Sequence, residues 1–176
     1  MKMDKVAGSG NDEFYTPQYA VEPILKYIPI TASVWCPFDT EQSNFVKMFR
    51  ARGNHVIHTH KNIIGEDFLT YEPYSNTSYD YIVSNPPYSL KNEVFEKLFR
   101  LGKPFAILVG VVGIFESKTR FNMFKENDFE IMYLNKRVSY FKNFDDPKPS
   151  LNPPFSSVYI TRGILPNRIV FEEVNK

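Results

Sequence analysis

The strongest constraint on the fold is the alternation of short apolar runs with amphipathic segments. Residues 105–112 form a nearly unbroken apolar run, which is typical of a strand with both faces buried in a parallel sheet. The preceding segment, 90–101, has its apolar residues at helical spacing and ends before Gly102, a residue common after helices. Such alternation predicts an α/β domain with a mostly parallel sheet.

The same patterns predict the remaining elements. We expect strands at 33–36, 55–58, 63–65, 79–83, 130–134, 156–161 and 168–174, and helices at 43–52 and 117–126. A further helix is expected after Thr16 as N-cap, with Pro17 in its first turn and a kink or restart at Pro23. The two strands that close the chain predict an antiparallel edge. The fold class is therefore an open, mostly parallel sheet with an antiparallel edge strand and helices on both faces.

Length and composition limit the organisation and the function. The 176 residues leave room for one domain, which we place at 12–176 after a flexible N-terminal arm at 1–11, without a separate target-recognition domain. One cysteine and three scattered histidines predict no disulfide and no metal site. No signal peptide or membrane span is evident, so we expect a cytoplasmic protein without a membrane partner. The net charge of +1 indicates that any nucleic-acid surface is local.

The segment Asn85-Pro86-Pro87-Tyr88 comes directly after a predicted strand, at the sheet edge where ligands bind in such folds. An exocyclic amine is a poor nucleophile because its lone pair is delocalised into the ring. The side-chain oxygen of Asn85 and a main-chain carbonyl, which we assign to Pro86, can accept its two N–H groups and direct the lone pair. Prolines hold that carbonyl without offering competing donors. The ring of Tyr88 can stack on a base that is flipped out of a duplex.

This segment resembles the motif of the amino-group methyltransferases that act on adenine N6, cytosine N4 or protein glutamine. Three more segments resemble motifs of that family in the same order: 11–17 (Asn-Asp-Glu-Phe-Tyr-Thr-Pro), 65–68 (Gly-Glu-Asp-Phe) and 152–157 (Asn-Pro-Pro-Phe-Ser-Ser). The chain is most similar to small bacteriophage-type adenine-N6 DNA methyltransferases. The resemblance implies a Rossmann-like methyltransferase fold, S-adenosylmethionine as cofactor and adenine N6 in DNA as the methylated group. In a phage, the host cytoplasm would be its location.

The resemblance also implies roles for individual residues. The catalytic segment would be Asn85, Pro86, Pro87 and Tyr88. The cofactor would be held by Tyr15, Thr16, Pro17, Asp39, Asp67, Phe68 and Asn85, with Asp67 on the adenine amino group and Phe68 against the adenine ring. The flipped base would be contacted by Tyr88 and Phe155, and phosphates by Lys118, Arg120, Lys136 and Arg137.

Two departures from the family pattern leave other functions open. The loop after the first predicted strand, 36–45, has no glycine where the family has two, although Asp39 can still receive the cofactor's amino group and Ser43 can cap the next helix. After the second strand, the family's acidic residue is replaced by His58-Thr59-His60. Methylation of RNA adenine or protein glutamine remains an alternative, as does a non-catalytic binding protein that acts as a phage decoy against host defence. The intact segment at 85–88 argues against the decoy. A homodimer is a further possibility for DNA recognition, on single or double strands.

Overall fold

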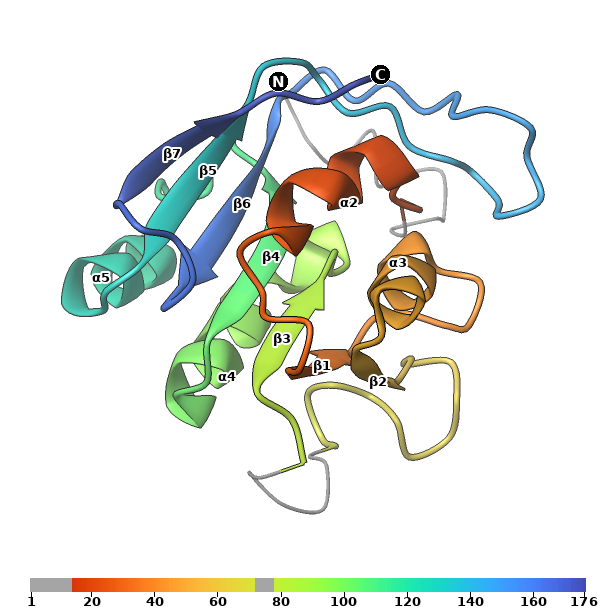
Figure 1. Cartoon of the computed structure of the whole chain (residues 1–176). Coiled ribbons are helices and arrows are strands. Elements are labelled where there is room, and N and C mark those ends of the chain that lie inside the picture. Colours follow the sequence, from red (N-terminus) through yellow and green to blue (C-terminus); the bar gives the residue numbers. More distant parts are fainter. Residues whose placement is uncertain (1–13, 72–77) are drawn as a thin grey trace.

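The computed structural model describes residues 14–71 and 78–176, so the N-terminal arm expected at 1–11 lies outside the described residues. The described part contains a seven-stranded sheet in the order β2-β1-β3-β4-β6-β5-β7 (Figure 1). Its strands are β1 (Ser33–Cys36), β2 (His55–His58), β3 (Tyr81–Ser84), β4 (Phe105–Gly110), β5 (Glu130–Leu134), β6 (Ser157–Arg162) and β7 (Ile169–Glu172). The helices are α2 (Gln18–Leu25), α3 (Asn44–Arg52), α4 (Lys91–Leu101) and α5 (Lys118–Glu126), with a short 3₁₀ turn, η1 (Tyr88–Leu90).

Strand directions confirm the predicted fold class. Strands β2, β1, β3 and β4 are mutually parallel, and β6 is antiparallel to both of its neighbours, β4 and β5. Strand β7 pairs in parallel with β5 and forms the edge of the sheet. The antiparallel strand, β6, is therefore the third strand from that edge. The last two strands of the chain are therefore not partners of each other, because β5 lies between them. The whole is a Rossmann-like α/β sheet.

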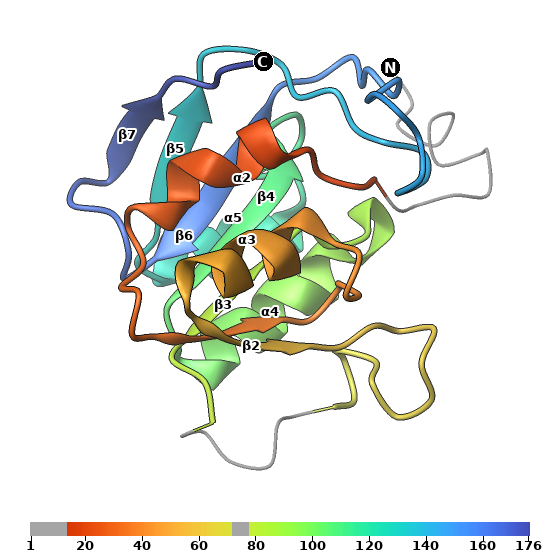
Figure 2. The same ribbon diagram turned by 45° about the vertical axis from the view of Figure 1, so that its right-hand side comes forward.

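Helices cover both faces of this sheet (Figures 1 and 2). Helices α2 and α3 pack on one face through a core that includes Ile24, Phe49 and Val83. Helices α4 and α5 pack on the other face, where Phe95 and Ile107 are fully buried. Strand β4 is buried along its whole length, which explains the unbroken apolar run at 105–110.

Two sequence predictions about local structure are wrong. Residues 63–65 form a turn and not a strand: Ile63 and Ile64 are 45% and 101% exposed, and the backbone of Gly65 has φ +80°. Two apolar residues without a buried face do not make a strand. The first helix begins at Gln18 with Pro17 as N-cap, and it runs through Pro23 without restarting. The Thr16 hydroxyl makes no cap contact in α2.

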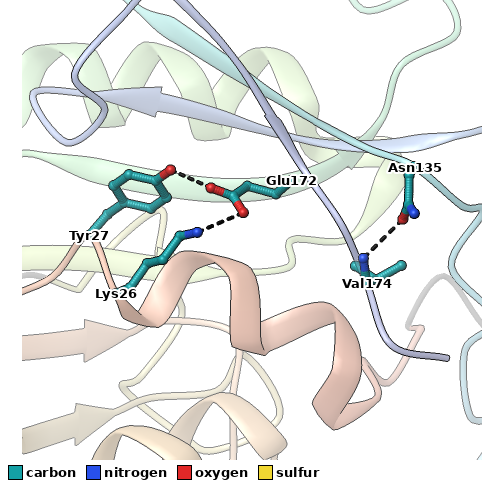
Figure 3. A network of polar contacts seen from close by, with 5 residues as sticks. All are labelled: Lys26, Tyr27, Asn135, Glu172 and Val174. Atoms are coloured by element: carbon teal, nitrogen blue, oxygen red, sulfur yellow. Dashed lines mark hydrogen bonds and ion pairs between the residues drawn. The ribbon is translucent and has the colours of Figure 1, made fainter.

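The far edge of the sheet is joined to α2 through Glu172 of β7 (Figure 3). Lys26 Nζ lies 2.7 Å from Glu172 Oε2, and the Tyr27 hydroxyl donates to the other carboxylate oxygen. Burial alone would raise the pKa of Glu172, but the hydrogen bonds from Lys26 and Tyr27 outweigh it and hold this pKa below its ordinary value of 4.5. Burial, helped by the same carboxylate, raises the pKa of Tyr27 to about 12. Nearby, Asn135 Oδ1 accepts from Val174 N–H at 2.9 Å.

We expect Glu172→Gln to lower the free energy of unfolding at pH 7 by about 1 kcal/mol, since a charge-assisted acceptor is lost while Lys26 is largely exposed. A carboxyl with a depressed folded-state pKa stabilises above its unfolded pKa, and this stabilisation is lost as the pH falls through the folded value. The difference in the free energy of unfolding between wild type and variant should therefore shrink as the pH falls below about 4.5. Thermal melts from pH 3 to 7 measure it. A gap of constant size across that range would contradict this account of Glu172.

Candidate functional site

A small cleft lies at the carboxyl ends of β1, β2 and β3. This is the edge where ligands bind in open α/β sheets. The cleft contains four of the residues expected to bind the cofactor, namely Tyr15, Thr16, Asp39 and Asn85, and also Pro87. The other lining residues were not singled out as cofactor contacts: Phe14, Phe38, Ser43, His60, Lys61 and Phe144.

Asp39 is the buried carboxylate of the cleft, with 8% of its surface exposed. It accepts hydrogen bonds from the hydroxyl of Ser43 and from that of Ser84, the latter at 2.5 Å. Ser43 is the N-cap residue of α3, yet its hydroxyl makes no cap bond. The expectation that Ser43 caps the helix with its side chain is therefore wrong, since its hydroxyl is directed at the Asp39 carboxylate.

The loop after β1 keeps its shape without glycine. The amide of Asp39 donates to the carbonyl of Thr59 at 3.0 Å, and the amide of Thr59 donates to the carbonyl of Cys36 at 3.1 Å. The indole of Trp35 donates to the Thr59 hydroxyl at 3.0 Å. Backbone pairing with the residues after β2 thus places Asp39 in the cleft.

Asn85 follows β3 directly, and only the nitrogen of its carboxamide has hydrogen-bond partners among the described residues. Its Nδ2 donates to the carbonyl of Phe14 at 2.8 Å and to the hydroxyl of Thr16 at 3.2 Å. Its Oδ1 is buried and accepts no hydrogen bond from any residue in the described ranges. Most buried polar atoms have partners, so an acceptor left open at a cleft calls for an explanation.

Two other asparagines serve as comparisons. Asn152 begins the second Asn-Pro-Pro segment, but its Oδ1 accepts from the Ser139 hydroxyl at 2.6 Å. Asn54 also has a buried Oδ1 without a described donor, while its Nδ2 donates to the carbonyls of Pro29 and Ala32. Asn54 comes just before β2, at the amino end of that strand and away from the cleft. Only Asn85 combines an open acceptor with the cleft, among these three.

The predicted base contacts, Tyr88 and Phe155, lie together. Their ring centroids are 5.4 Å apart, and the Phe14 ring meets Tyr88 edge-on at 4.7 Å. Phe155 packs over Gly110 at the end of β4.

Asp67 and Phe68 do not line the cleft. Phe68 is fully buried against Trp35 and Phe38, at ring distances of 5.4 and 5.1 Å. The Asp67 carboxylate accepts from the amide of Leu69 at 2.9 Å and so closes a local turn. Phe38 contacts Phe68 and lines the cleft, so its ring is one of those available to a flat ligand there, with Phe14, Tyr15 and Phe144.

Of the four expected phosphate contacts, Arg120 already has partners within the protein. Its guanidinium donates to Asn92 Oδ1, to the carbonyl of Ile114 and to the carbonyl of Gly113, at 2.8, 2.8 and 2.9 Å. It therefore braces the turn after β4 against α4. Lys118, Lys136 and Arg137 are exposed. No cluster of three metal-ligating side chains occurs within residues 14–71 and 78–176. In the same ranges no helix has the length and apolar character that a membrane crossing requires.

The sequence matches no protein-family model and no curated protein. Among solved structures, the chain is similar to a modification subunit of a putative type I restriction enzyme from Vibrio vulnificus, with a TM-score of 0.55 and 12% identity over 97% of this chain and 49% of that one. The chain thus spans about half the length of that protein. It is also similar to a TehB-like SAM-dependent methyltransferase from Corynebacterium glutamicum (TM-score 0.43, 12% identity, 89% and 91% covered). The chain is similar as well to a precorrin-6y C5,15-methyltransferase from Geobacter metallireducens, with a TM-score of 0.42 and 10% identity over 86% of this chain and 92% of that one. The first likeness supports the fold.

We expect Gly110→Ala to lower the free energy of unfolding by about 1–3 kcal/mol, the usual cost of overpacking. A Cβ at Gly110 would lie 2.7 Å from ring carbons of Phe155, whereas the backbone there is one that alanine adopts freely. In a Phe155→Ala background the same change should cost much less. Urea unfolding of the four proteins in this cycle measures the coupling. Equal costs in both backgrounds would show that Phe155 does not pack on Gly110.

Proposed function

We propose that this protein transfers a methyl group from S-adenosylmethionine to the N6 amino group of adenine in DNA. The observation that carries the proposal is the buried, unpartnered Oδ1 of Asn85 at the carboxyl end of β3, next to a cleft. An atom that can only accept a hydrogen bond, and lacks a donor, matches an N–H group brought by a substrate.

The residues of the cleft fit the proposed cofactor. Asp39 offers a buried carboxylate for a positively charged amino group, and Phe38 offers a ring face for an adenine. Tyr15 and Thr16 line the same cleft, as the family resemblance implies. Asp67 and Phe68 are the exceptions, and His58-Thr59-His60 stands where the family has an acidic residue. When bound, the cofactor supplies an electrophilic methyl group, which leaves its sulfur as the amine nitrogen attacks.

The chain's own residues prepare the amine. Asn85 Oδ1 accepts one N–H of the substrate amino group. The Pro87 carbonyl already accepts from the amide of Leu90 at 3.2 Å, so we assign the second N–H to the carbonyl of Pro86. Two acceptors at one nitrogen favour a tetrahedral geometry and a localised lone pair, and the extra proton leaves to solvent after transfer.

The aromatic residues beside Asn85 suit a flat substrate. Tyr88 makes edge-on ring contacts with Phe155 and with Phe14, and Phe14 lines the cleft. A base that stacks on Tyr88 would replace one of these contacts by a face-on one, and such a stack is worth about 1–3 kcal/mol. DNA as the polymer is favoured by the likeness to a restriction-enzyme modification subunit, together with the exposed cations Lys118, Lys136 and Arg137. The polymer class is the part that the experiment below must decide.

The wild-type protein should transfer tritium from methyl-labelled cofactor to DNA in preference to RNA or protein. Asn85→Ala should lower kcat by about 10²–10³ while cofactor affinity in calorimetry stays near the wild-type value, because the lost contact acts mainly in the transition state. Asn54→Ala is the matched control: it removes an asparagine whose Oδ1 is likewise buried without a described partner, away from the cleft, and it should alter stability but not the rate per folded molecule.

Three outcomes would contradict the proposal. The absence of both cofactor binding and transfer would remove the enzymatic function. Transfer to RNA or protein alone would correct the substrate. Equal turnover by Asn85→Ala and wild type would remove the assigned role of Asn85.

A further inference from the structure

We infer that Thr16 is a positioning residue that, with the carbonyl of Phe14, turns the Asn85 carboxamide so that only its oxygen faces the substrate. This inference rests on the proposed function, because it concerns how the amine acceptor is set. A carboxamide has nearly the same shape when Oδ1 and Nδ2 exchange places. In the exchanged orientation Asn85 would present two donors to an amine that also donates, and the contact would be lost.

The Phe14 carbonyl removes that ambiguity, and the Thr16 hydroxyl, which can accept as well as donate, gives Nδ2 a second acceptor. The Phe14 carbonyl can only accept, and it lies 2.8 Å from Asn85 Nδ2. The Thr16 hydroxyl lies 3.2 Å from the same nitrogen, although Thr16 and Asn85 are 69 residues apart in the sequence. With both donors of Nδ2 directed at the segment 14–16, Oδ1 is left as the only polar atom of the side chain without a described partner.

The segment 14–16 is itself held from two sides. Asn44, the first residue of α3, donates from Nδ2 to the carbonyl of Thr16 at 2.8 Å. Tyr15 and Phe141 exchange two backbone hydrogen bonds, of 2.9 and 3.3 Å, which join the segment to the long loop between β5 and β6. Thr16 is 5% exposed, so its hydroxyl is not free to turn toward bulk solvent. A fixed support of this kind can hold the orientation of Asn85 while a substrate enters.

The consequence is selectivity for an amino group. A carbonyl in the same place, as in hypoxanthine, would bring an acceptor against the acceptor of Asn85. The site should therefore reject deaminated bases through the carboxamide orientation, and loss of the Thr16 hydroxyl should weaken that rejection. A role of Thr16 in holding the cofactor, which the family resemblance implies, predicts a different result: weaker cofactor binding.

The test compares Thr16→Val, which keeps the shape but removes the hydroxyl, with Thr16→Ser, which keeps the hydroxyl. We expect Thr16→Val to lower kcat about tenfold, equivalent to one hydrogen bond, with less than a twofold change in cofactor Kd and in KM. Thr16→Ser should restore most of the rate. Thr161→Val is the matched control, because it removes a buried hydroxyl of β6 that contacts Glu130 of β5 and not Asn85.

The second readout is independent of turnover. In ¹⁵N-labelled protein, the side-chain NH₂ protons of Asn85 should exchange slowly with water in wild type and Thr16→Ser, and at least severalfold faster in Thr16→Val. Unchanged exchange in Thr16→Val would overturn the inference, as would an unchanged kcat or a loss confined to cofactor Kd. If the wild type methylates nothing, the proposed function fails, and the exchange rates still decide whether Thr16 orients Asn85.

Discussion

The site depends on the hydrogen bonds that the carboxylate of Asp39 accepts. This carboxylate joins the loop after β1, the first turn of α3 and the last residue of β3 by accepting from Ser43 and Ser84, the latter 45 residues away in sequence. A buried carboxylate is costly unless donors surround it, and two hydroxyls meet that need here. Since Ser84 immediately precedes Asn85, the same interaction fixes where the Asn-Pro-Pro-Tyr segment leaves the sheet. The glycine-less loop is thus held by hydrogen bonds in place of a tight glycine turn.

Elements with a long apolar period could be predicted from the sequence. The buried run of β4 and the amphipathic helix α4 with Gly102 after it occur as expected, because their patterns reflect burial directly. The strand predicted at 63–65 failed for the opposite reason: two apolar residues suffice for the pattern, but no neighbouring strand or helix covers them. The position of β7 outside β5 could not be predicted either, since strand order depends on crossover connections that local periodicity does not encode.

Within the site, residue types were easier to predict than partners. Asn85 was singled out because it follows a strand at the edge where ligands bind, and Asp39 because of the family resemblance; both line the cleft. Phe68 was expected to contact the cofactor because an aromatic residue after an acidic one fits the family motif. Its ring packs in the core instead, between Trp35 and Lys97. Arg120 looked like a phosphate contact, whereas the carbonyls of the turn after β4 occupy its donors. Such competition between a ligand and the protein itself is visible only in three dimensions.

The central claim is that the open acceptor of Asn85 serves the N6 amino group of adenine. The most direct measurement is mass spectrometry of nucleosides from DNA incubated with the protein and with S-adenosylmethionine carrying a deuterated methyl group. The account predicts labelled N6-methyl-2′-deoxyadenosine as the main modified deoxynucleoside, with its amount falling to background when Asn85 is replaced. Label found only on cytosine N4, or no labelled nucleoside although the cofactor binds, would contradict it.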